Sequence, residues 1–191
     1  MKKWIVMFIS LLLLVGAYLT FWYPGTNQEA PQKSVQSLKI GQTYQTDDFT
    51  FKLIDQKHFI TLDDHTDYAN QDELDEALED DEDDYPWLTV YEGEYKRDGS
   101  KIYLRPTSSA TLDFDDVKSI KQKAYANIDK ETYQEDFPKT AQLQKTKTGY
   151  YYLETIKSLS INEEKTPIYH SKKTLPDSLE AFLKNYHTSN N

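Results

Sequence analysis

The most acidic stretch of the sequence has the residue types needed to bind a hard cation. Ten of the thirteen residues from Asp72 to Asp84 are Asp or Glu. Carboxylate oxygens are among the ligands that Ca²⁺ prefers, and the ion takes six to eight oxygens. Weak Ca²⁺ binding is therefore the one cofactor chemistry that the sequence suggests. The candidate metal ligands lie at the end of the stretch, and they are Asp80, Asp81, Asp83 and Asp84.

The spacing of these acids does not fit a calcium-binding loop. Counted from Asp63, an EF-hand loop needs a glycine at its sixth position and a carboxylate at its twelfth, where the chain has Tyr68 and Leu74. Apolar spacing from Leu74 favours a short helix in the front half of the stretch. A run of like charges repels itself, so a solvated acidic excursion over residues 63–85 is the simpler interpretation, and docking of a basic partner is another.

Aromatic residues supply a second candidate site. The chain has 15 Tyr and 3 Trp, and several of them fall on one predicted hairpin. Rings that flank a cleft can stack on sugars or on peptide side chains, and their polar tips can form hydrogen bonds. The alternative is that tyrosines, which favour strands, fill the rim of a sheet with their hydroxyl groups in water. The candidate ligand-binding residues are Trp87, Tyr91, Tyr95 and Tyr103.

No catalytic residue can be assigned from a motif. The sequence has no Cys, which excludes disulfides, a thiol nucleophile and a lipid-modified cysteine. Its glycines do not form a nucleotide-binding loop, its four histidines lack metal-binding spacing, and it contains no G-x-S-x-G. A net charge of −10 argues against general nucleic-acid binding. An enzyme acting on cell-wall carbohydrate through an unassigned pair of carboxylates stays open as an alternative.

Residues 4–23 are long and apolar enough to cross a membrane as a helix. None of them is charged. At about 1.5 Å per residue, such a helix spans about 30 Å, the thickness of a bilayer's hydrocarbon core. Lys2 and Lys3 precede the segment, which places the N-terminus in the cytoplasm, and Pro24-Gly25 ends the helix. The sequence thus predicts a single-pass anchor in residues 1–24, with everything that follows outside the cell membrane.

A cleaved signal peptide is the alternative to an anchor. The apolar core of a signal peptide usually runs about 7–15 residues and ends at a small-x-small cleavage site. The apolar run here is longer, and Gly16-Ala17-Tyr18 matches such a site poorly. Both interpretations export the bulk of the chain. Residues 25–37 are polar and predict a flexible tether, and residues 38–191 are expected to form one β-rich extracytoplasmic domain.

Alternation of apolar and polar residues predicts a hairpin in this domain. Trp87 to Tyr95 places every second residue on one face of a strand, and Ser100 to Arg105 alternates in the same way. Asp98-Gly99 between them is a strong signal for a two-residue turn, here expected as type I′. Further strands are expected over residues 49–53, 58–62, 110–114, 149–161 and 165–170.

Apolar residues at helical spacing predict two short helices. The first begins at Asp115-Asp116, and its apolar stripe extends to Ile128. The second runs from Pro176 to His187, with proline in its first turn. Together these patterns predict an α+β domain dominated by β structure, in which a small antiparallel sheet or barrel with two short helices follows the single N-terminal transmembrane helix.

The stretch from Tyr91 to Leu104, YEGEYKRDGSKIYL, resembles a hairpin unit that recurs in small exported, lipocalin-like β-barrel proteins of Gram-positive bacteria. Many members of that group are lipid-anchored, whereas this chain has no cysteine after its apolar segment, so a protein anchor would replace the lipid. The resemblance implies a barrel and a ligand-binding or partner-binding module, and it carries over no catalytic residue. The expected function is a non-enzymatic binding or accessory module of the bacterial cell envelope, with an envelope protein or a cell-wall component as its partner.

A calcium titration separates the two main interpretations of the acidic excursion. If residues 63–85 are solvated surface, about 5 mM CaCl₂ added after EDTA leaves the melting temperature of the chain unchanged. A site with a Kd of about 1 mM would instead stabilise the fold by about 1 kcal/mol and raise the melting temperature by about 2–4 °C. Differential scanning fluorimetry measures the shift. A rise with CaCl₂ that MgCl₂ does not produce would overturn the solvated-surface interpretation.

Overall fold

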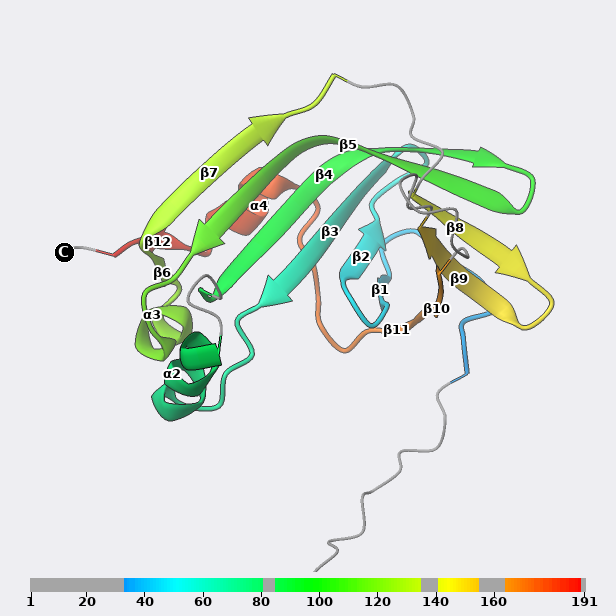
Figure 1. The fold of residues 1–191 in the computed structure, drawn as a ribbon. Helices are drawn as coiled ribbons and strands as arrows, with labels where there is room; N and C mark the ends of the chain where they lie inside the picture. Colours follow the sequence, from blue (N-terminus) through cyan, green and yellow to red (C-terminus); the bar gives the residue numbers. More distant parts are fainter. Residues whose placement is uncertain (1–32, 81–84, 135–140, 155–163, 190–191) are drawn as a thin grey trace, which may run out of the picture. The chain divides into compact units, whose positions relative to one another are not determined.

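Antiparallel β structure dominates the computed structural model, which describes residues 33–80, 85–134, 141–154 and 164–189 (Figure 1). The ten strands of the main sheet are β1 (Thr43–Gln45), β2 (Thr50–Leu53), β3 (His58–His65), β4 (Trp87–Asp98), β5 (Lys101–Asp113), β7 (Asn127–Thr132), β8 (Ala141–Thr146), β9 (Gly149–Glu154), β10 (Glu164–Pro167) and β11 (Tyr169–His170). Their order in the sheet is β10-β9-β8-β5-β4-β3-β2-β1-β11, and β7 pairs with the second half of β5.

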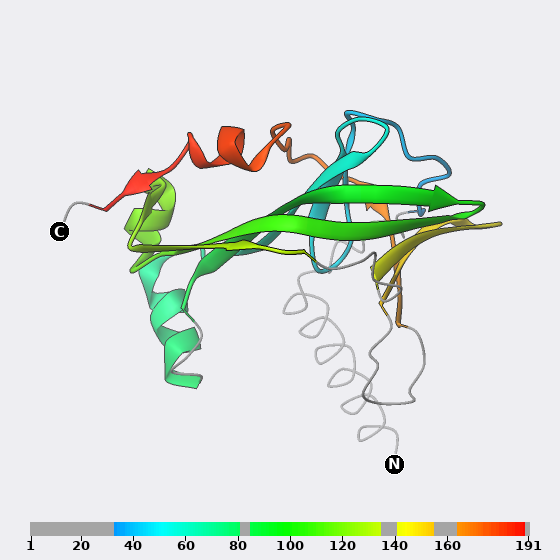
Figure 2. The ribbon, with the colours of Figure 1, turned by 90° about the horizontal axis from the view of Figure 1, so that it is seen from above.

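Three helices and a two-stranded sheet complete the described structure. α2 (Gln71–Asp80) follows β3, α3 (Val117–Gln122) follows β5, and α4 (Leu179–Leu183) lies near the C-terminus. β6 (Ala124–Tyr125) and β12 (His187–Thr188) pair in parallel. α4 lies on one side of the main sheet, whereas α2 projects from the other side (Figure 2).

One end of the main sheet closes almost completely into a barrel. β10 pairs with β9 and β11 pairs with β1, and only Ile168 separates β10 from β11 along the chain. Ile168 donates its N–H to the carbonyl of Tyr150 and accepts the N–H of Val35, while Tyr150 donates to the carbonyl of Val35. Ser34 and Val35 are buried at this seam. Packed structure thus begins within the segment that the sequence assigns to the tether.

The β4–β5 hairpin confirms the prediction from the alternation pattern. Asp98 pairs with Lys101, which leaves Gly99 and Ser100 as the two turn residues. Gly99 has a φ of 58°, whereas Ser100 does not have a positive φ. A glycine with positive φ at the first central position alone is the pattern of a type II′ turn, so the expected type I′ is corrected. Both types match the twist of the flanking strands, which is why the hairpin forms in either case.

A bulge in this hairpin lets β5 take part in both halves of the sheet. The pairing shifts by one residue next to Gly93, which leaves Thr107 as the extra residue on β5. A Cβ atom on Gly93 would lie 2.2 Å from the carbonyl oxygen of Arg105, so only glycine allows the two backbones to approach this closely. Before the bulge β5 pairs with β8, and after it β5 pairs with β7.

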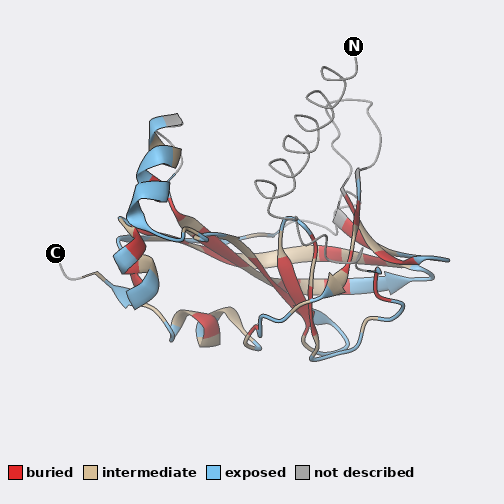
Figure 3. Cartoon of the chain, turned by 90° about the horizontal axis from the view of Figure 1, so that it is seen from below, coloured by how far each residue is buried: buried red, intermediate tan, exposed pale blue. Residues whose placement is uncertain are grey.

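Two apolar cores lie along the sheet. The first fills the barrel, and Tyr44, Phe51 and Leu143 are among its fully buried members. The second lies on the α4 side, where Phe182 and Leu175 pack against one face of β3, β4 and β5. Buried residues follow these strands along much of their length, while α2 is mostly exposed (Figure 3). The strand residues of the second core are Ile60, Leu62, Leu88, Val90 and Leu112.

Polar contacts hold the C-terminal segment on the second core. The side chain of Lys52 is only 5% exposed, and its Nζ lies 2.7 Å from the carboxylate of Asp177 and donates to the carbonyl of Leu175. The N–H of Leu179 donates to the carboxylate of Glu92 at 2.7 Å. A buried ammonium group is costly without such partners, so these bonds fix where α4 begins on the sheet.

The helices after β5 are shorter than predicted. The helix expected from Asp115 ends after Gln122, because Lys123 adopts the left-handed conformation with a φ of 58°. Residues from Ala124 to Ile128 then continue as strands, and not as the expected helical stripe. The C-terminal helix is confirmed as α4, but it has only five residues. α2 confirms the short helix that apolar spacing from Leu74 favours in the front half of the acidic stretch, and it continues to Asp80.

Parts of the prediction fall outside the described residues. β9 ends at Glu154, and the remainder of the strand expected up to residue 161 is not described. The strand expected over 165–170 is confirmed as β10 and β11. No helix in the described ranges is long and apolar enough to span a membrane, and the anchor predicted in residues 1–24 lies outside those ranges.

Replacing Gly93 tests whether the close approach of β4 and β5 is required. Gly93→Ala forces the backbone of Arg105 away and is expected to lower the free energy of unfolding by about 3 kcal/mol, near the upper end of overpacking penalties. Gly99→Ala is the matched control, because its added methyl group meets no atom within 4 Å and only its positive φ is strained, at about 1 kcal/mol. Urea unfolding followed by tryptophan fluorescence measures both variants. Equal losses of unfolding free energy in the two variants would contradict the requirement for glycine at position 93.

Candidate functional site

The face of β3 that turns away from α4 changes from apolar to polar along the strand. Phe59 belongs to the barrel core, and Thr61, Asp63 and His65 follow it on the same face, because strand side chains alternate. The corresponding faces of β4, which pairs with β3, and of β5, which pairs with β4, also change from apolar to polar. We call the outer part of this surface the polar face, and its residues are Asp63, His65, Trp87, Thr89, Tyr91, Ser109 and Thr111.

A stacked pair of rings lies at the outer end of the polar face. The ring of His65 lies 4.0 Å from the indole ring of Trp87, with the planes at 19°, and the two residues are paired across β3 and β4. His65 Nε2 lies 3.0 Å from Oδ1 of Asp63. The side chain of His65 is 49% exposed. A flat aromatic surface is thus accessible to solvent directly beside a carboxylate.

Hydroxyl groups on the polar face are largely paired with one another. The hydroxyl oxygens of Thr89 and Thr111 lie 2.8 Å apart across β4 and β5. Tyr133, just beyond β7, donates its hydroxyl hydrogen to Oε2 of Glu131 at 2.6 Å and accepts from Ser109 at 2.9 Å. These bonds hold the side chains in fixed positions, with Thr89 and Ser109 buried and Thr111 and Tyr133 partly exposed, so the outer polar face is a preorganised array of hydrogen-bonding groups.

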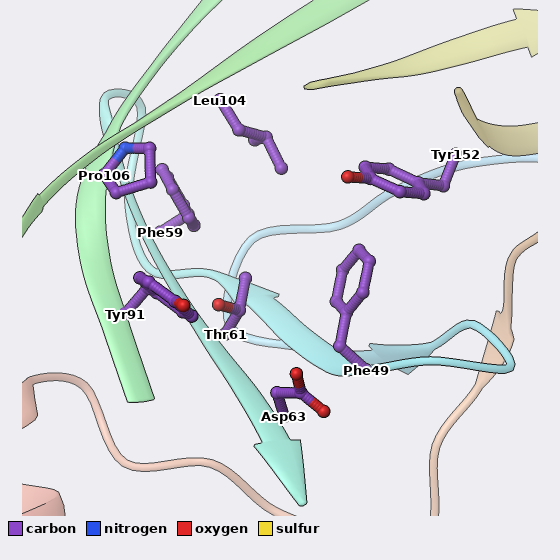
Figure 4. Close-up of a pocket in the computed structure, with 8 residues that line it drawn as sticks. All are labelled: Phe49, Phe59, Thr61, Asp63, Tyr91, Leu104, Pro106 and Tyr152. Carbon is purple, nitrogen blue, oxygen red and sulfur yellow. The ribbon is translucent and has the colours of Figure 1, made fainter. Parts of the chain in front are cut away.

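A pocket of about 180 Å³ lies where the polar face meets the barrel core (Figure 4). Its base is buried, since Phe59 and Leu104 belong to the barrel core and Thr61 is 8% exposed. Its rim is half-buried and consists of Phe49, Asp63, Tyr91, Pro106 and Tyr152. The pocket is therefore closed toward the barrel and accessible from the side of the polar face.

Polar atoms without partners point toward this mostly apolar pocket. Among the described residues, the hydroxyl groups of Thr61 and Tyr91 have no hydrogen-bond partner. The carboxylate of Asp63 is contacted by His65 through Oδ1, and its second oxygen has no partner within the described ranges. Two hydroxyl groups and one carboxylate oxygen are thus available to a ligand (Figure 4).

The electrostatic environment of the pocket favours positive charge. Burial raises the pKa of Asp63, the nearby carboxylates of Asp48 and Asp64 raise it further, and His65 opposes these effects. Burial also raises the pKa of the Tyr91 hydroxyl, with additional contributions from the negative charges of Asp63 and Glu131. Like charge disfavours a further negative charge here, whereas a positive charge next to Asp63 would be attracted to its carboxylate.

The neighbouring Asp64 has the opposite behaviour. Burial alone would raise its pKa, but hydrogen bonds from Lys173 and Thr66 outweigh burial and lower it. Lys173 Nζ lies 2.8 Å from Oδ2 of Asp64, and the Thr66 hydroxyl donates to Oδ1 at 2.6 Å. Asp64 is thus a stabilising structural carboxylate, whereas ionised Asp63 costs stability. Carboxylates held under such a cost are common at functional sites.

The four predicted aromatic ligand-binding residues lie in different places. Trp87 and Tyr91 share the polar face, and Tyr91 lines the pocket. Tyr95 is buried in the barrel core, where its hydroxyl donates to the carbonyl of Asp55 at 2.7 Å. Tyr103 alternates with core residues of β5 and therefore lies on the outer surface of the barrel, away from the pocket.

The predicted cation ligands are mostly outside the described residues. Asp80 is the last residue of α2, and residues 81–84 are not described. Within the described ranges, no group of three or more His, Asp or Glu side chains is arranged to hold a metal ion. Calcium binding by Asp80, Asp81, Asp83 and Asp84 stays a prediction.

Most residues of the pocket were not predicted from the sequence. The change from Phe59 to Thr61 and Asp63 along one strand face is visible in the sequence and could have located the polar side of the pocket. Phe49 and Tyr152 come from segments a hundred residues apart, and their rings meet edge to face with centroids 4.8 Å apart. Only closure of the barrel brings them together.

Comparisons with protein-family models, with curated protein sequences and with solved structures find no match to this chain. The resemblance of the β4–β5 hairpin to lipocalin-like barrels therefore stays a prediction.

Substitution of the two neighbouring carboxylates is expected to change stability in opposite directions at pH 7. Asp64→Asn loses the charge-assisted bond to Lys173 and should lower the free energy of unfolding by about 1 kcal/mol. Asp63→Asn removes an ionised group that burial disfavours and should raise the free energy of unfolding by about 0.5 kcal/mol, after allowance for solvent screening.

The direction of each change in the free energy of unfolding follows from the direction of the pKa shift of the carboxylate that is replaced. Asp63 has a folded pKa above its ordinary value of 3.8, so its ionisation destabilises the fold at higher pH. Asp64 has a folded pKa below 3.8, so its ionisation stabilises the fold, and this stability is lost as the pH falls through that lowered pKa. Urea unfolding at pH 7 and at about pH 3 measures both effects. Shifts of the same sign in both variants at pH 7 would contradict the assignment.

Proposed function

We propose that the protein is a non-catalytic binding module of the bacterial cell envelope, held at the outer face of the cell membrane by an anchor in residues 4–23. It binds its ligand through the pocket and the adjoining polar face. The observation that carries this proposal is the convergence of the free polar groups of Thr61, Tyr91 and Asp63 on an apolar pocket. Small numbers of placed polar groups in an apolar hollow are the usual form of a ligand site.

The polar face supports a ligand longer than the pocket. Trp87 and His65 offer an accessible stacked ring surface beyond Asp63, and paired hydroxyl groups lie beside them on β4 and β5. Rings of this kind stack on sugars and on peptide side chains. A cell-wall polymer or an envelope protein fits this surface, with one group entering the pocket and its neighbours lying along the strands.

Binding is favoured over catalysis by the arrangement of carboxylates. Hydrolysis of a glycosidic bond uses a pair of carboxyl groups placed on the two sides of the bond. Among the described residues that line the pocket, Asp63 is the only carboxylate. Glu131, the nearby acid on β7, already accepts a hydrogen bond from Tyr133. A single carboxylate suits recognition of charge better than general acid–base chemistry.

The proposed location rests on the sequence of the N-terminal segment. Residues 4–23 carry no charge, and Lys2 and Lys3 orient the segment with its N-terminus in the cytoplasm. The domain would then face the cell wall, where polymers with repeated groups are concentrated. Repeated groups increase binding through effective concentration, even where each contact is weak.

Sedimentation with isolated Gram-positive cell-wall sacculi tests the proposal. The full chain in detergent is expected to sediment with the sacculi. Tyr91→Ala should weaken the affinity for sacculi about tenfold relative to the wild-type chain, because it removes a ring and a free hydroxyl from the pocket. Tyr103→Ala is the matched control, since Tyr103 lies on the opposite side of β5 and should change binding less than about twofold.

A location measurement completes this test. Protease added to intact spheroplasts that express the full chain should digest the domain and leave the anchor in the membrane fraction. Failure of the wild-type chain to bind sacculi, or equal binding by Tyr91→Ala, would refute the proposed binding site. Resistance of the domain to external protease until the cells are lysed would refute the proposed location.

A further inference from the structure

We propose that the group entering the pocket is an alkylammonium cation, the chemistry shared by choline-type head groups and methylated lysine side chains. This inference rests on the proposed binding function and specifies the class of ligand group at the same pocket. It is carried by four aromatic rings and a single carboxylate placed around a cavity of about 180 Å³ (Figure 4).

Aromatic rings line the pocket on opposite sides. Phe59 and Tyr91 lie on one side, and Phe49 and Tyr152 lie on the other (Figure 4). The rings of Phe49 and Tyr152 are nearly perpendicular, with an interplanar angle of 85°. The face of an aromatic ring carries negative potential and attracts an ammonium group, and several rings around one cavity are the known form of a quaternary-ammonium cage. Methyl groups on the cation add apolar contact with the same rings.

The charge around this cage is negative. Asp63 is the only charged side chain in the described lining, which contains neither Lys nor Arg. Asp48 and Asp64 lie close enough to act on the Asp63 carboxylate as like charges. A cation in the pocket would therefore gain attraction from Asp63, whereas an anionic ligand would meet repulsion in a poorly solvated space.

Among the described residues, the neighbouring basic side chains leave one carboxylate oxygen of Asp63 without a partner. His65 contacts Asp63 through Oδ1 at 3.0 Å. Lys173 pairs with Asp64, whose side chain alternates to the other face of β3. In the described structure the second carboxylate oxygen of Asp63 has no partner, so it can form an ion pair with a cationic group of a ligand in the pocket.

The cavity has the size of a head group. Pockets for drug-sized ligands usually have volumes of about 300–1,000 Å³. The volume here is about 180 Å³, which suits a trimethylammonium group with a short carbon stem and excludes a whole sugar chain or lipid. The remainder of the ligand would leave the pocket past Asp63 and lie along the polar face.

Binding of small ammonium compounds to the full chain in detergent micelles tests this inference. The probes are tetramethylammonium, choline and trimethyl-lysine, each compared with a neutral isostere in which carbon replaces the quaternary nitrogen. NMR shifts of the methyl groups of Thr61 and Leu104 report binding at the base of the pocket. The cations are expected to bind with a Kd of about 1 mM and about tenfold more tightly than the neutral isosteres, because shape is equal and only charge differs. Tighter binding of choline or of trimethyl-lysine identifies a head group or a peptide as the source.

Paired variants separate the contributions of the carboxylate and the rings. Asp63→Asn and Tyr91→Leu should each weaken tetramethylammonium binding about tenfold, whereas Tyr91→Phe keeps the ring and should retain most of the affinity. Tyr103→Leu is the control outside the pocket. Melting temperatures of all four variants establish that the fold is kept.

Two outcomes would overturn the alkylammonium assignment. One is equal binding of cations and neutral isosteres, and the other is cation binding that Asp63→Asn does not reduce. If either occurs while binding to sacculi still depends on Tyr91, the binding function stands and the pocket takes another group. If binding to sacculi is also independent of Tyr91, the proposed function fails together with the inference.

Discussion

The close approach of β4 and β5 at Gly93 is the constraint on which the rest of the described structure depends. It permits the bulge at Thr107, and the bulge redirects β5 so that its first half pairs with β8 in the barrel and its second half pairs with β7 in an open sheet. One strand face is therefore the inside of a barrel at Phe59 and an accessible surface at Asp63. The pocket lies at this junction because the lining changes from apolar to polar there.

The two faces of β3, β4 and β5 contribute unequally to stability. The α4 side buries aliphatic residues against Phe182 and Leu175, and the ion pair between Lys52 and Asp177 holds that cover in place. The polar face instead carries hydroxyl groups and the half-buried carboxylate of Asp63, whose pKa is raised by burial, so that its ionisation reduces stability. A fold selected for stability alone would place apolar residues there. The stability lost by placing polar groups on this face is consistent with selection for a binding surface. The apolar core on the α4 side provides the compensating stability.

Local patterns in the sequence predict what depends on near neighbours. Alternation from Trp87 to Tyr95 identifies a strand, its paired hairpin and the shared face of Trp87 and Tyr91, all of which the structure confirms. Features fixed by distant contacts are not predictable in this way. The left-handed conformation of Lys123 ends a helix whose apolar spacing continues beyond it. Tyr95 and Tyr91 look equivalent in the sequence, yet barrel closure buries one in the core and leaves the other at the pocket.

Weak binding by a pocket of this size would be sufficient for the proposed role. All lining residues except Phe49, which directly precedes β2, come from strands of the sheet, so little conformational entropy is lost when a small cation enters. A single ammonium group in a half-exposed cage still gains only a modest free energy, which corresponds to millimolar affinity. Confinement would change the outcome, because the proposed membrane-tethered domain and a polymer with many copies of the group would share a thin layer. The effective concentration in that layer can exceed a millimolar Kd, so occupancy would be set by the density of groups in the envelope and would respond to changes in it.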